Sequence, residues 1–495
     1  KGCNALDFED ILNFCLKLFE SHADKMQEIR DRFRYVMVDE YQDTNSVQYR
    51  LLKHLVRDHR NLCVVGDDDQ SIYGWRGAEP GNLFQFEKDF PDVKVVRLEQ
   101  NYRSTEVILK AANALIENNS QRMPKTLWSE KPGGELLGWI EAEDEVLETE
   151  TVVRRIRLDI MRHNRKLEEY CILYRSNFQS RVLEESLREA KLPYRVVGGK
   201  SFFERKEIRD ALAYLKLIQN PNDLVSLQRV INTPRRGIGK TSLMQLNACV
   251  AETSLPVLKI MSQARKYSSI PAEAASSMEV FSALLGDFQS RFEKGNLGEV
   301  FRELLDELGY LRFLEQQSGD VKSREKRIQV VQELLRGAQR YAEDHPENQL
   351  GDYLERMMLF SENDDQDGST SQALTLMTLH SAKGLEFPYV YMVGMSEGLF
   401  PNPRALDDDA EEEERRLCYV GITRAQRELV FSMAKTRKRY QETLLQEPSR
   451  FLMELDPKLF STPVIGEASL EQKGKMKKRS RSDFFQNLKQ FNSQP

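Results

Sequence analysis

Three common patterns are absent from this 495-residue chain. Its six cysteines form no Cys-x-x-Cys pair and none lies at metal-ligand spacing from a histidine, so we expect reduced thiols. No apolar run approaches the roughly 20 residues that cross a bilayer, and no basic-then-apolar signal opens the sequence. These absences predict an ordinary globular protein of the cytoplasm with no membrane partner.

An excess of basic charge is also absent. The chain has 72 lysine and arginine residues against 78 aspartate and glutamate residues, a formal net charge of −6. A nucleic-acid partner therefore cannot be inferred from overall charge, and any such site must be a local groove. The length exceeds what one core accommodates, so two to four domains are expected.

A phosphate-binding glycine loop is missing as well. The nearest match, Gly237-Ile238-Gly239-Lys240-Thr241-Ser242, has Pro234 where the full pattern needs a glycine, and it follows a helical pattern instead of a strand. We therefore reject it as an ATP site. A short Gly-x-Gly turn beside basic side chains suits duplex phosphates better. The candidate DNA contacts here are Gly237, Gly239 and Lys240, flanked by Arg235 and Arg236.

The chain does contain two strand-then-acid signals in close succession. The first is Tyr35-Val36-Met37-Val38-Asp39-Glu40, an apolar run that ends in two carboxylates. Phosphate and magnesium sites form at the carboxyl ends of buried parallel strands. Asp39 would hold magnesium, and Glu40 would orient and deprotonate an attacking water. Acids that merely cap a following helix explain an isolated match equally well.

The second signal runs from Val64 to Ala78. Gln70 follows three aspartates just past a strand, and its amide could contact a terminal phosphate and the attacking water together. A turn stabilised by aspartate side chains is the alternative. It does not explain Tyr73, Trp75 and Arg76, which lie among glycines and form a plausible platform for stacking exposed bases.

Two arginines lie more than 300 residues apart, each where a strand gives way to a helix. Arg103 and Arg424 could meet at one phosphate and neutralise charge on a transferred phosphoryl group. Either arginine alone would more often be a surface salt bridge. The segment from Thr378 to Phe387 adds hydroxyls, His380 and Lys383 in a loop at a strand end, which is consistent with gripping a nucleic-acid backbone.

Periodicity along the chain predicts an α/β fold. Residues 1–98 alternate helix and strand, with a third strand expected at Val93–Leu98, and a second α/β set follows over 99–200. Strand signals nearly vanish over 201–372, which is predicted to be a helical insertion, and they resume over 373–459. The acidic run Asp407–Glu414 is expected to be a solvated surface segment, and the basic residues 460–495 are expected to be a disordered tail.

Taken together, these motifs resemble the UvrD/Rep/PcrA family of superfamily 1 DNA helicases, and its Rep-like members most closely. The resemblance covers nearly the whole chain, from Asn4-Ala5-Leu6-Asp7-Phe8 to Pro448-Ser449-Arg450-Phe451-Leu452. It implies two RecA-like domains, the first of them incomplete, with ATP and Mg²⁺ between them and a helical subdomain inserted in the second. Single-stranded DNA would run across both domains, with translocation from 3′ to 5′.

The resemblance also implies a role for each matching residue. Asp39 and Glu40 would be the magnesium-binding and water-activating acids, and Gln70 would sense the phosphate. Tyr102 would stack on adenine, Glu386 would bind the ribose, and Arg103 and Arg424 would contact the γ-phosphate. The DNA contacts would be Tyr73, Trp75, Arg76, Thr378 and His380, together with Gly237, Gly239 and Lys240 on the duplex.

One departure from the family pattern is large. Members of the family begin with a Gly-x-x-x-x-Gly-Lys-Thr loop, whereas this chain begins at Lys1 and contains none. We therefore expect a fragment of an ATP-dependent 3′–5′ DNA helicase that is inactive by itself. The alternative is a DNA-binding or partner-binding module that does not hydrolyse ATP. Junctions of single-stranded and duplex DNA and replication or repair proteins are the expected partners, with the motor acting as a monomer or a dimer.

Overall fold

The computed structural model describes residues 6–79, 81–198, 201–253, 255–317, 321–347, 349–358, 372–407, 410–439 and 442–461. The chain divides into two compact units. Lys1–Arg175 and Thr375–Pro495 form the first, and Ser176–Leu374, which lies between those segments in sequence, forms the second. The predicted basic tail lies outside the described residues from position 462 onward.

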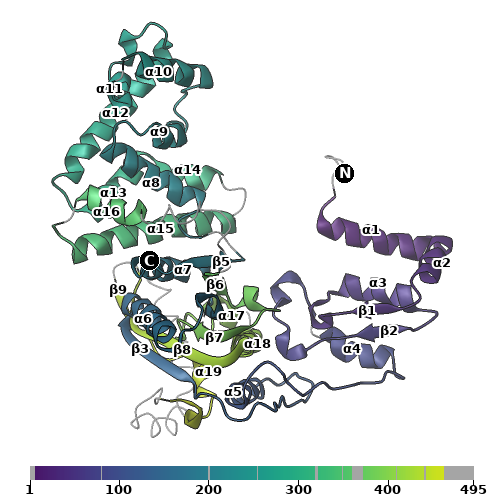
Figure 1. The fold of residues 1–495 in the computed structure, drawn as a ribbon. Helices are drawn as coiled ribbons and strands as arrows, with labels where there is room; N and C mark the ends of the chain where they lie inside the picture. Colours follow the sequence, from purple (N-terminus) through teal and green to yellow (C-terminus); the bar gives the residue numbers. More distant parts are fainter. Residues whose placement is uncertain are drawn as a thin grey trace, which may run out of the picture. The chain divides into compact units, whose positions relative to one another are not determined.

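The first unit opens with a small α/β segment (Figure 1). Strands β1 (Val36–Val38) and β2 (Leu62–Val64) pair in parallel, with Met37 opposite Cys63. Their buried neighbours include Tyr41, Tyr49 and Phe86, but Met37 itself is 79% exposed. The helices of this segment are α1 (Phe8–Ser21), α2 (Ala23–Arg32), α3 (Ser46–Val56) and α4 (Gly81–Asp89).

Local sequence explains the helix starts in this segment. Asp7 and Asp10 form a capping box at the start of α1, and Asn45 and Gln48 do the same for α3. The strand expected at Val93–Leu98 is wrong, because these residues form an irregular segment. Leu98 is 81% exposed and no neighbouring strand satisfies the backbone there among the described residues.

A larger parallel sheet forms the centre of the first unit, which confirms the predicted α/β class. Its strands run in the order β3-β8-β7-β4-β6, and β9 pairs antiparallel with β8. Strand β4 is buried at every position, as expected for a central parallel strand. The strands are β3 (Gly138–Asp144), β4 (Tyr170–Tyr174), β6 (Leu374–Thr378), β7 (Phe387–Met392), β8 (Ala425–Arg439) and β9 (Glu442–Leu445).

Three helices that pack on or beside this sheet determine where Arg424 lies. Helix α6 (Glu145–His163) contacts β3 and β8, while α5 (Glu106–Ile116) contacts β8 and α18 (Glu411–Ile422). The short helices α17 (Pro403–Asp407) and α19 (Arg450–Met453) complete this part of the first unit. Because α18 ends immediately before Thr423 and Arg424, its packing fixes where that arginine lies.

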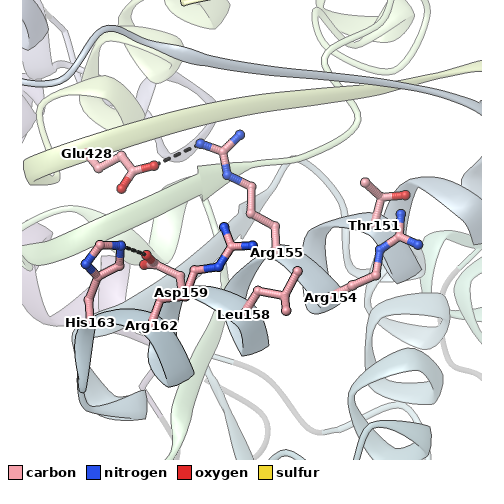
Figure 2. A pocket seen from close by; sticks show the side chains of 8 residues that line it. All are labelled: Thr151, Arg154, Arg155, Leu158, Asp159, Arg162, His163 and Glu428. Atoms are coloured by element: carbon pink, nitrogen blue, oxygen red, sulfur yellow. Dashed lines mark hydrogen bonds and ion pairs between the residues drawn. The ribbon is translucent and has the colours of Figure 1, made fainter.

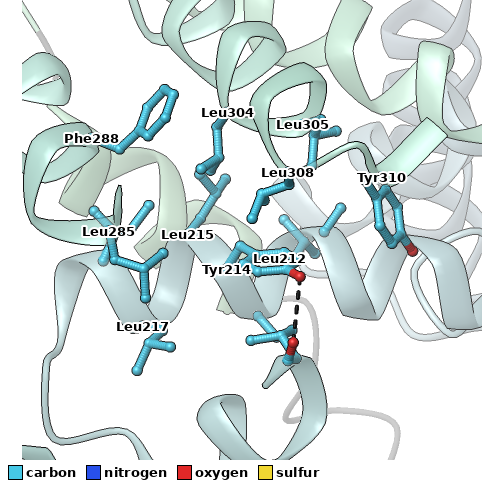
Figure 3. Close-up of a cluster of buried hydrophobic side chains, with 14 of the residues drawn as sticks. Leu212, Tyr214, Leu215, Leu217, Leu285, Phe288, Leu304, Leu305, Leu308 and Tyr310 are labelled. Atoms are coloured by element: carbon cyan, nitrogen blue, oxygen red, sulfur yellow. Dashed lines mark hydrogen bonds between the residues drawn. The ribbon is translucent and has the colours of Figure 1, made fainter. Parts of the chain in front are cut away.

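The second unit is mostly helical and has its own apolar core. Figure 3 shows Leu215, Leu285, Phe288 and Leu304 packed together, with Tyr214 and Tyr310 beside them. The ring of Tyr214 meets that of Tyr310 edge-on at 6.4 Å. The elements are α7 (Ser180–Glu189), β5 (Tyr194–Val197), α8 (Lys206–Gln219), α9 (Leu224–Val230), α10 (Lys240–Thr253), α11 (Val257–Met261), α12 (Ala272–Phe292), α13 (Leu297–Glu307), α14 (Tyr310–Gln317), α15 (Val321–Asp344) and α16 (Leu350–Met358).

Across the described ranges of both units, none of the helices has the length and apolar character needed to cross a membrane.

Candidate functional site

The first pair of predicted acids follows β1 directly. Glu40 has a left-handed backbone (φ 50°), a conformation that costs a non-glycine residue free energy and is often found at functional sites. The Oδ1 atom of Asp39 accepts a hydrogen bond from the Glu40 N–H at 2.9 Å. Both carboxylates are exposed, so each can reach a ligand outside the β1 end.

The second signal lies beside the first. The side-chain Oε1 of Gln42 accepts the Asp67 N–H at 2.9 Å, which ties the two strand ends together. Gln70 then bridges two groups: its Nε2 donates to Asp67 Oδ2 at 2.7 Å, and its Oε1 accepts from Arg424 Nη2 at 3.3 Å. The amide thus uses its donor and its acceptor at the same time, as the sequence suggested it could.

The three aspartates before Gln70 have cationic partners that the sequence analysis missed. The ammonium of Lys125 lies 2.9, 2.6 and 2.8 Å from Asp67, Asp68 and Asp69, and Arg122 forms a two-point contact with Asp69. Burial lowers the pKa of Lys125, but the three carboxylates outweigh it and raise this pKa above its usual range. The trio has a spacing suited to a cation, and here that cation is the lysine.

The two predicted arginines meet at the end of α18. Arg103 Nη1 donates to the Thr423 carbonyl at 3.2 Å, and Arg424 Nη2 donates to the Thr423 hydroxyl at 3.0 Å. Arg424 is 2% exposed and also donates to the carbonyls of Val420 and Leu385. Burial, reinforced by the positive charge of Arg103, lowers the pKa of Arg424 to about 10. It therefore remains charged at neutral pH.

The two predicted nucleotide-contacting side chains beside the arginines differ in exposure. Glu386 Oε2 lies 2.5 Å from Arg103 Nε, and Gln426 donates to its other oxygen at 2.8 Å. The hydrogen bond from Arg103 is the main cause of the lowered pKa of Glu386. Tyr102 is 74% exposed, with its hydroxyl donating to Gln100. Its ring is therefore open to a planar ligand.

Lys383 does not lie where a backbone-gripping lysine would. Its ammonium is 2.5 Å from Asp43 Oδ2 and 3.3 Å from Glu40 Oε2, and it donates to the Gln70 carbonyl at 2.9 Å. Its side chain is 7% exposed. Lys383 therefore links the loop after β6 to both strand ends and is engaged with acids instead of being free for DNA.

The predicted stacking residues form one aromatic cluster. Trp75 is 63% exposed. The centroid of its ring lies 6.5 Å from that of Tyr73 and 6.4 Å from that of His380, and the guanidinium of Arg76 lies 4.6 Å from the Trp75 centroid. We call Tyr73, Trp75, Arg76 and His380 the aromatic platform. Thr378, by contrast, uses its hydroxyl to receive the Ser381 N–H and to bond the Ser381 hydroxyl.

His380 is expected to titrate far below an ordinary histidine. Burial, with the charges of Arg175 and Arg76, lowers its pKa to about 4 from 6.5. Because the folded-state pKa lies below the unfolded one, protonation favours unfolding, and stability is lost as the pH falls from about 6.5 toward 4. NMR titration of the imidazole should show no charge change above pH 5, and His380→Gln should reduce the acid sensitivity. A titration midpoint near 6.5 would contradict the effect of this half-buried position beside two guanidinium groups.

The remaining predicted residues lie in the second unit. Gly237 has a left-handed backbone (φ 73°), which favours glycine, and open space lies around Gly237 and Gly239. Lys240 is exposed at the first position of α10. Arg236 was expected to offer positive charge to duplex phosphates beside the turn. Its Nη1 instead donates to the carbonyls of Val230, Ile231 and Pro234, so the side chain stabilises the turn.

The expectation of a solvated acidic run at Asp407–Glu414 is wrong for its last residues, while residues 408 and 409 lie outside the described ranges. Glu414 is buried and is bound at two points by Arg175. Residues from Glu411 onward are the first turn of α18, where negative charge is favourable.

A separate cavity of about 470 Å³ lies against α6 and β8 (Figure 2). Arg155 points across it to Glu428, and Asp159 pairs with His163. Its other lining residues are Thr151, Arg154, Leu158 and Arg162. None of the predicted site residues lines it.

Two family models match this sequence. The UvrD/REP helicase N-terminal domain matches residues 1–91 and the UvrD-like helicase C-terminal domain matches residues 96–436. The ATP-dependent DNA helicase PcrA of Staphylococcus aureus is 41% identical over 468 residues, which cover 94% of this chain and 63% of the relative. PcrA of Bacillus subtilis is 41% identical over 458 residues, which cover 91% and 61%. The chain thus spans less than two thirds of the length of these relatives.

Proposed function

Since this chain belongs to the UvrD-like helicase family, we propose that it carries most of the motor of an ATP-dependent 3′–5′ DNA helicase. The observation that carries the proposal is the amide of Gln70, hydrogen-bonded to Asp67 on one side and to Arg424 on the other. It joins the acid-bearing strand ends of the first α/β segment to the arginine pair at the end of α18. A site of this form can respond to a phosphate placed between them.

We assign the nucleotide roles to the residues around that amide. Asp39 has an exposed carboxylate of the oxygen-ligand type that Mg²⁺ takes, and Glu40 would orient the attacking water. Bound Mg²⁺ would neutralise charge on the phosphates. Arg103 and Arg424 would hold the γ-phosphate. The exposed ring of Tyr102 would stack on adenine and Glu386 would bind the ribose.

We assign single-stranded DNA to the aromatic platform, with Thr378 beside it. The exposed face of Trp75 and the adjacent guanidinium of Arg76 suit the stacking of bases and the attraction of phosphates. Gly237, Gly239 and Lys240 would contact duplex phosphates from the second unit. Residues 1–98 would be part of one RecA-like domain, 99–200 with 373–459 a second, and 201–372 a helical subdomain inserted in the second.

The 495-residue chain contains no Gly-x-x-x-x-Gly-Lys-Ser/Thr segment. We therefore expect it to bind single-stranded DNA without turning over ATP, as a non-hydrolysing DNA-binding module would. The helicase activity is tested with the full-length protein on duplexes that carry a 3′ or a 5′ single-stranded tail. ATP-dependent unwinding of the 3′-tailed duplex alone is expected. Preference for the 5′ tail, or unwinding without ATP, would contradict the proposal.

Trp75→Ala should weaken binding of the chain to oligo(dT) by about 5- to 150-fold, because one base–aromatic stack contributes about 1–3 kcal/mol. Fluorescence anisotropy of a labelled oligonucleotide measures this change. Trp128→Phe is the matched control, since Trp128 is also partly exposed but pairs through its backbone with Gln100, away from the platform. Equal losses in the two variants would argue against the platform.

A further inference from the structure

The four glutamates that begin α18 do not share one role. Glu411 pairs with Arg415 and Arg450, Glu412 accepts from the backbone and hydroxyl of Ser120, and Glu414 pairs with Arg175. Glu413 differs from these three because its carboxylate meets the backbone of Gly74. All four charges favour the helix start, but Glu413 is the one whose carboxylate meets the turn that carries Trp75 and Arg76.

The contact between Glu413 and Gly74 is close. A β-carbon built on Gly74 would lie 2.4 Å from Glu413 Oε2, so no larger residue fits while the carboxylate stays in place. The Gly74 backbone N–H also lies close enough to this carboxylate to lower its pKa, although burial raises the pKa overall. Gly74 is the first residue of the tight turn Gly74–Arg76. The carboxylate therefore holds the backbone from which Trp75 and Arg76 project.

The other end of α18 lies at the nucleotide side. Its C-cap is Thr423, and the next residue, Arg424, donates to Gln70 at 3.3 Å. Between the two ends the helix packs against α5 and against the turn Asp68–Gln70. Glu413 and Ile422, the last helical residue, are nine positions apart, which is about 14 Å along the helix. One element thus touches both functional groups.

We propose that Glu413 is a positioning residue for the aromatic platform, and that α18 mechanically joins this platform to the phosphate-contacting arginine. The proposal rests on the proposed function, because it deepens the link between DNA and nucleotide. A shift of α18 that accompanies movement of Arg424 would be passed through Glu413 to the backbone of Gly74, and from there to Trp75.

Three single variants of the 495-residue chain, and the double variant Glu413→Ala/Gly74→Ala, test the positioning role. Glu413→Ala should weaken oligo(dT) binding at least about fivefold, the equivalent of about 1 kcal/mol from one impaired stack. Glu413→Gln keeps an acceptor oxygen for the Gly74 N–H and should recover most of the affinity. Gly74→Ala should weaken binding to a similar degree, because its methyl group displaces the carboxylate. The double variant should be no weaker than either single alanine variant, since both act through one contact.

Glu412→Ala is the matched control, since it removes a carboxylate from the same helical turn without touching Gly74. It should leave the affinity within about twofold, because its carboxylate contacts Ser120 and not Gly74. Losses that are equal in Glu412→Ala and Glu413→Ala, or additive losses in the double variant, would overturn the proposal. Thermal melts followed by circular dichroism identify any variant that fails to fold. If Glu413→Ala is such a variant, the oligo(dT) affinity of Glu413→Gln is compared with that of the parent chain, and a loss equal to that of Gly74→Ala would contradict the proposal.

A second readout works without DNA. The fluorescence of Trp75, taken as the difference between the parent chain and Trp75→Phe, reports how accessible its ring is to acrylamide. Glu413→Ala should raise this accessibility and Glu412→Ala should not; no change in the first would overturn the proposal. If the parent chain fails to bind oligo(dT), the DNA role of the platform is wrong, while the acrylamide result still decides whether Glu413 positions Trp75.

Discussion

Arg424→Lys should lower the DNA-stimulated ATP turnover of the full-length protein by roughly a thousandfold or more, the range of an arginine that stabilises a transferred phosphoryl group. The guanidinium donates from Nε, Nη1 and Nη2 to Val420, Leu385 and Gln70. Lysine keeps the charge but cannot reproduce this planar set of donors. Steady-state phosphate release with saturating oligo(dT) measures the effect.

The control for this substitution is three residues away. Arg427 is exposed, and Arg427→Lys should leave turnover unchanged. Affinity of Arg424→Lys for single-stranded DNA should stay within about threefold of the parent, because the interaction that is lost belongs to the transition state of hydrolysis. Equal losses of turnover and DNA affinity would argue against the phosphate-contacting role.

Lys125→Met should strongly destabilise the first unit, with a loss of about 3–5 kcal/mol in the free energy of unfolding. It removes the ammonium that lies within 2.9 Å of three aspartates, two of which are buried. Since the pKa of Lys125 is raised on folding, its contribution is complete below the usual lysine pKa and is lost only as the pH rises above it. Urea unfolding at pH 7 measures the loss.

Lys110→Met provides the comparison. Lys110 pairs with Glu106 one helical turn away, with both side chains largely exposed, so its removal should change the stability little. If the two methionine variants unfold at the same urea concentration, the aspartates do not depend on Lys125 in the way the structure indicates.

Local signals in the sequence predicted that acids and an amide follow the first two strands, and the chemical roles of these residues stay predictions. Asp39, Glu40 and Gln70 follow short apolar runs, and a strand that ends in acids is readable within ten residues. The ion pair between Arg103 and Glu386, which lie 283 positions apart, was not predicted, because the family resemblance implied only separate nucleotide contacts for the two residues. It joins segments that share no local pattern, and periodicity carries no information about such contacts.

The features that the sequence did not predict also depend on contacts between residues that are distant in sequence. Lys125 binds aspartates 56 to 58 positions earlier, and nothing near it in sequence marks it as their partner. The run at Glu411–Glu414 was expected to be solvated because charge predicts exposure, yet Glu414 is buried by Arg175. Val93–Leu98 has strand-like composition, but a strand also needs a neighbour that offers hydrogen bonds.

The small β1–β2 pair has a consequence for how tightly a ligand can bind. Each strand is three residues long, and Met37, the central residue of β1, is largely exposed to solvent. Two-stranded sheets are marginally stable, and regions with few buried contacts open at little cost in free energy. Asp39 and Glu40 therefore follow a strand pair that is expected to open more easily than the larger parallel sheet. A nucleotide bound there would have to hold that pair closed, so its affinity would include the cost of ordering the strands as well as the contacts it makes.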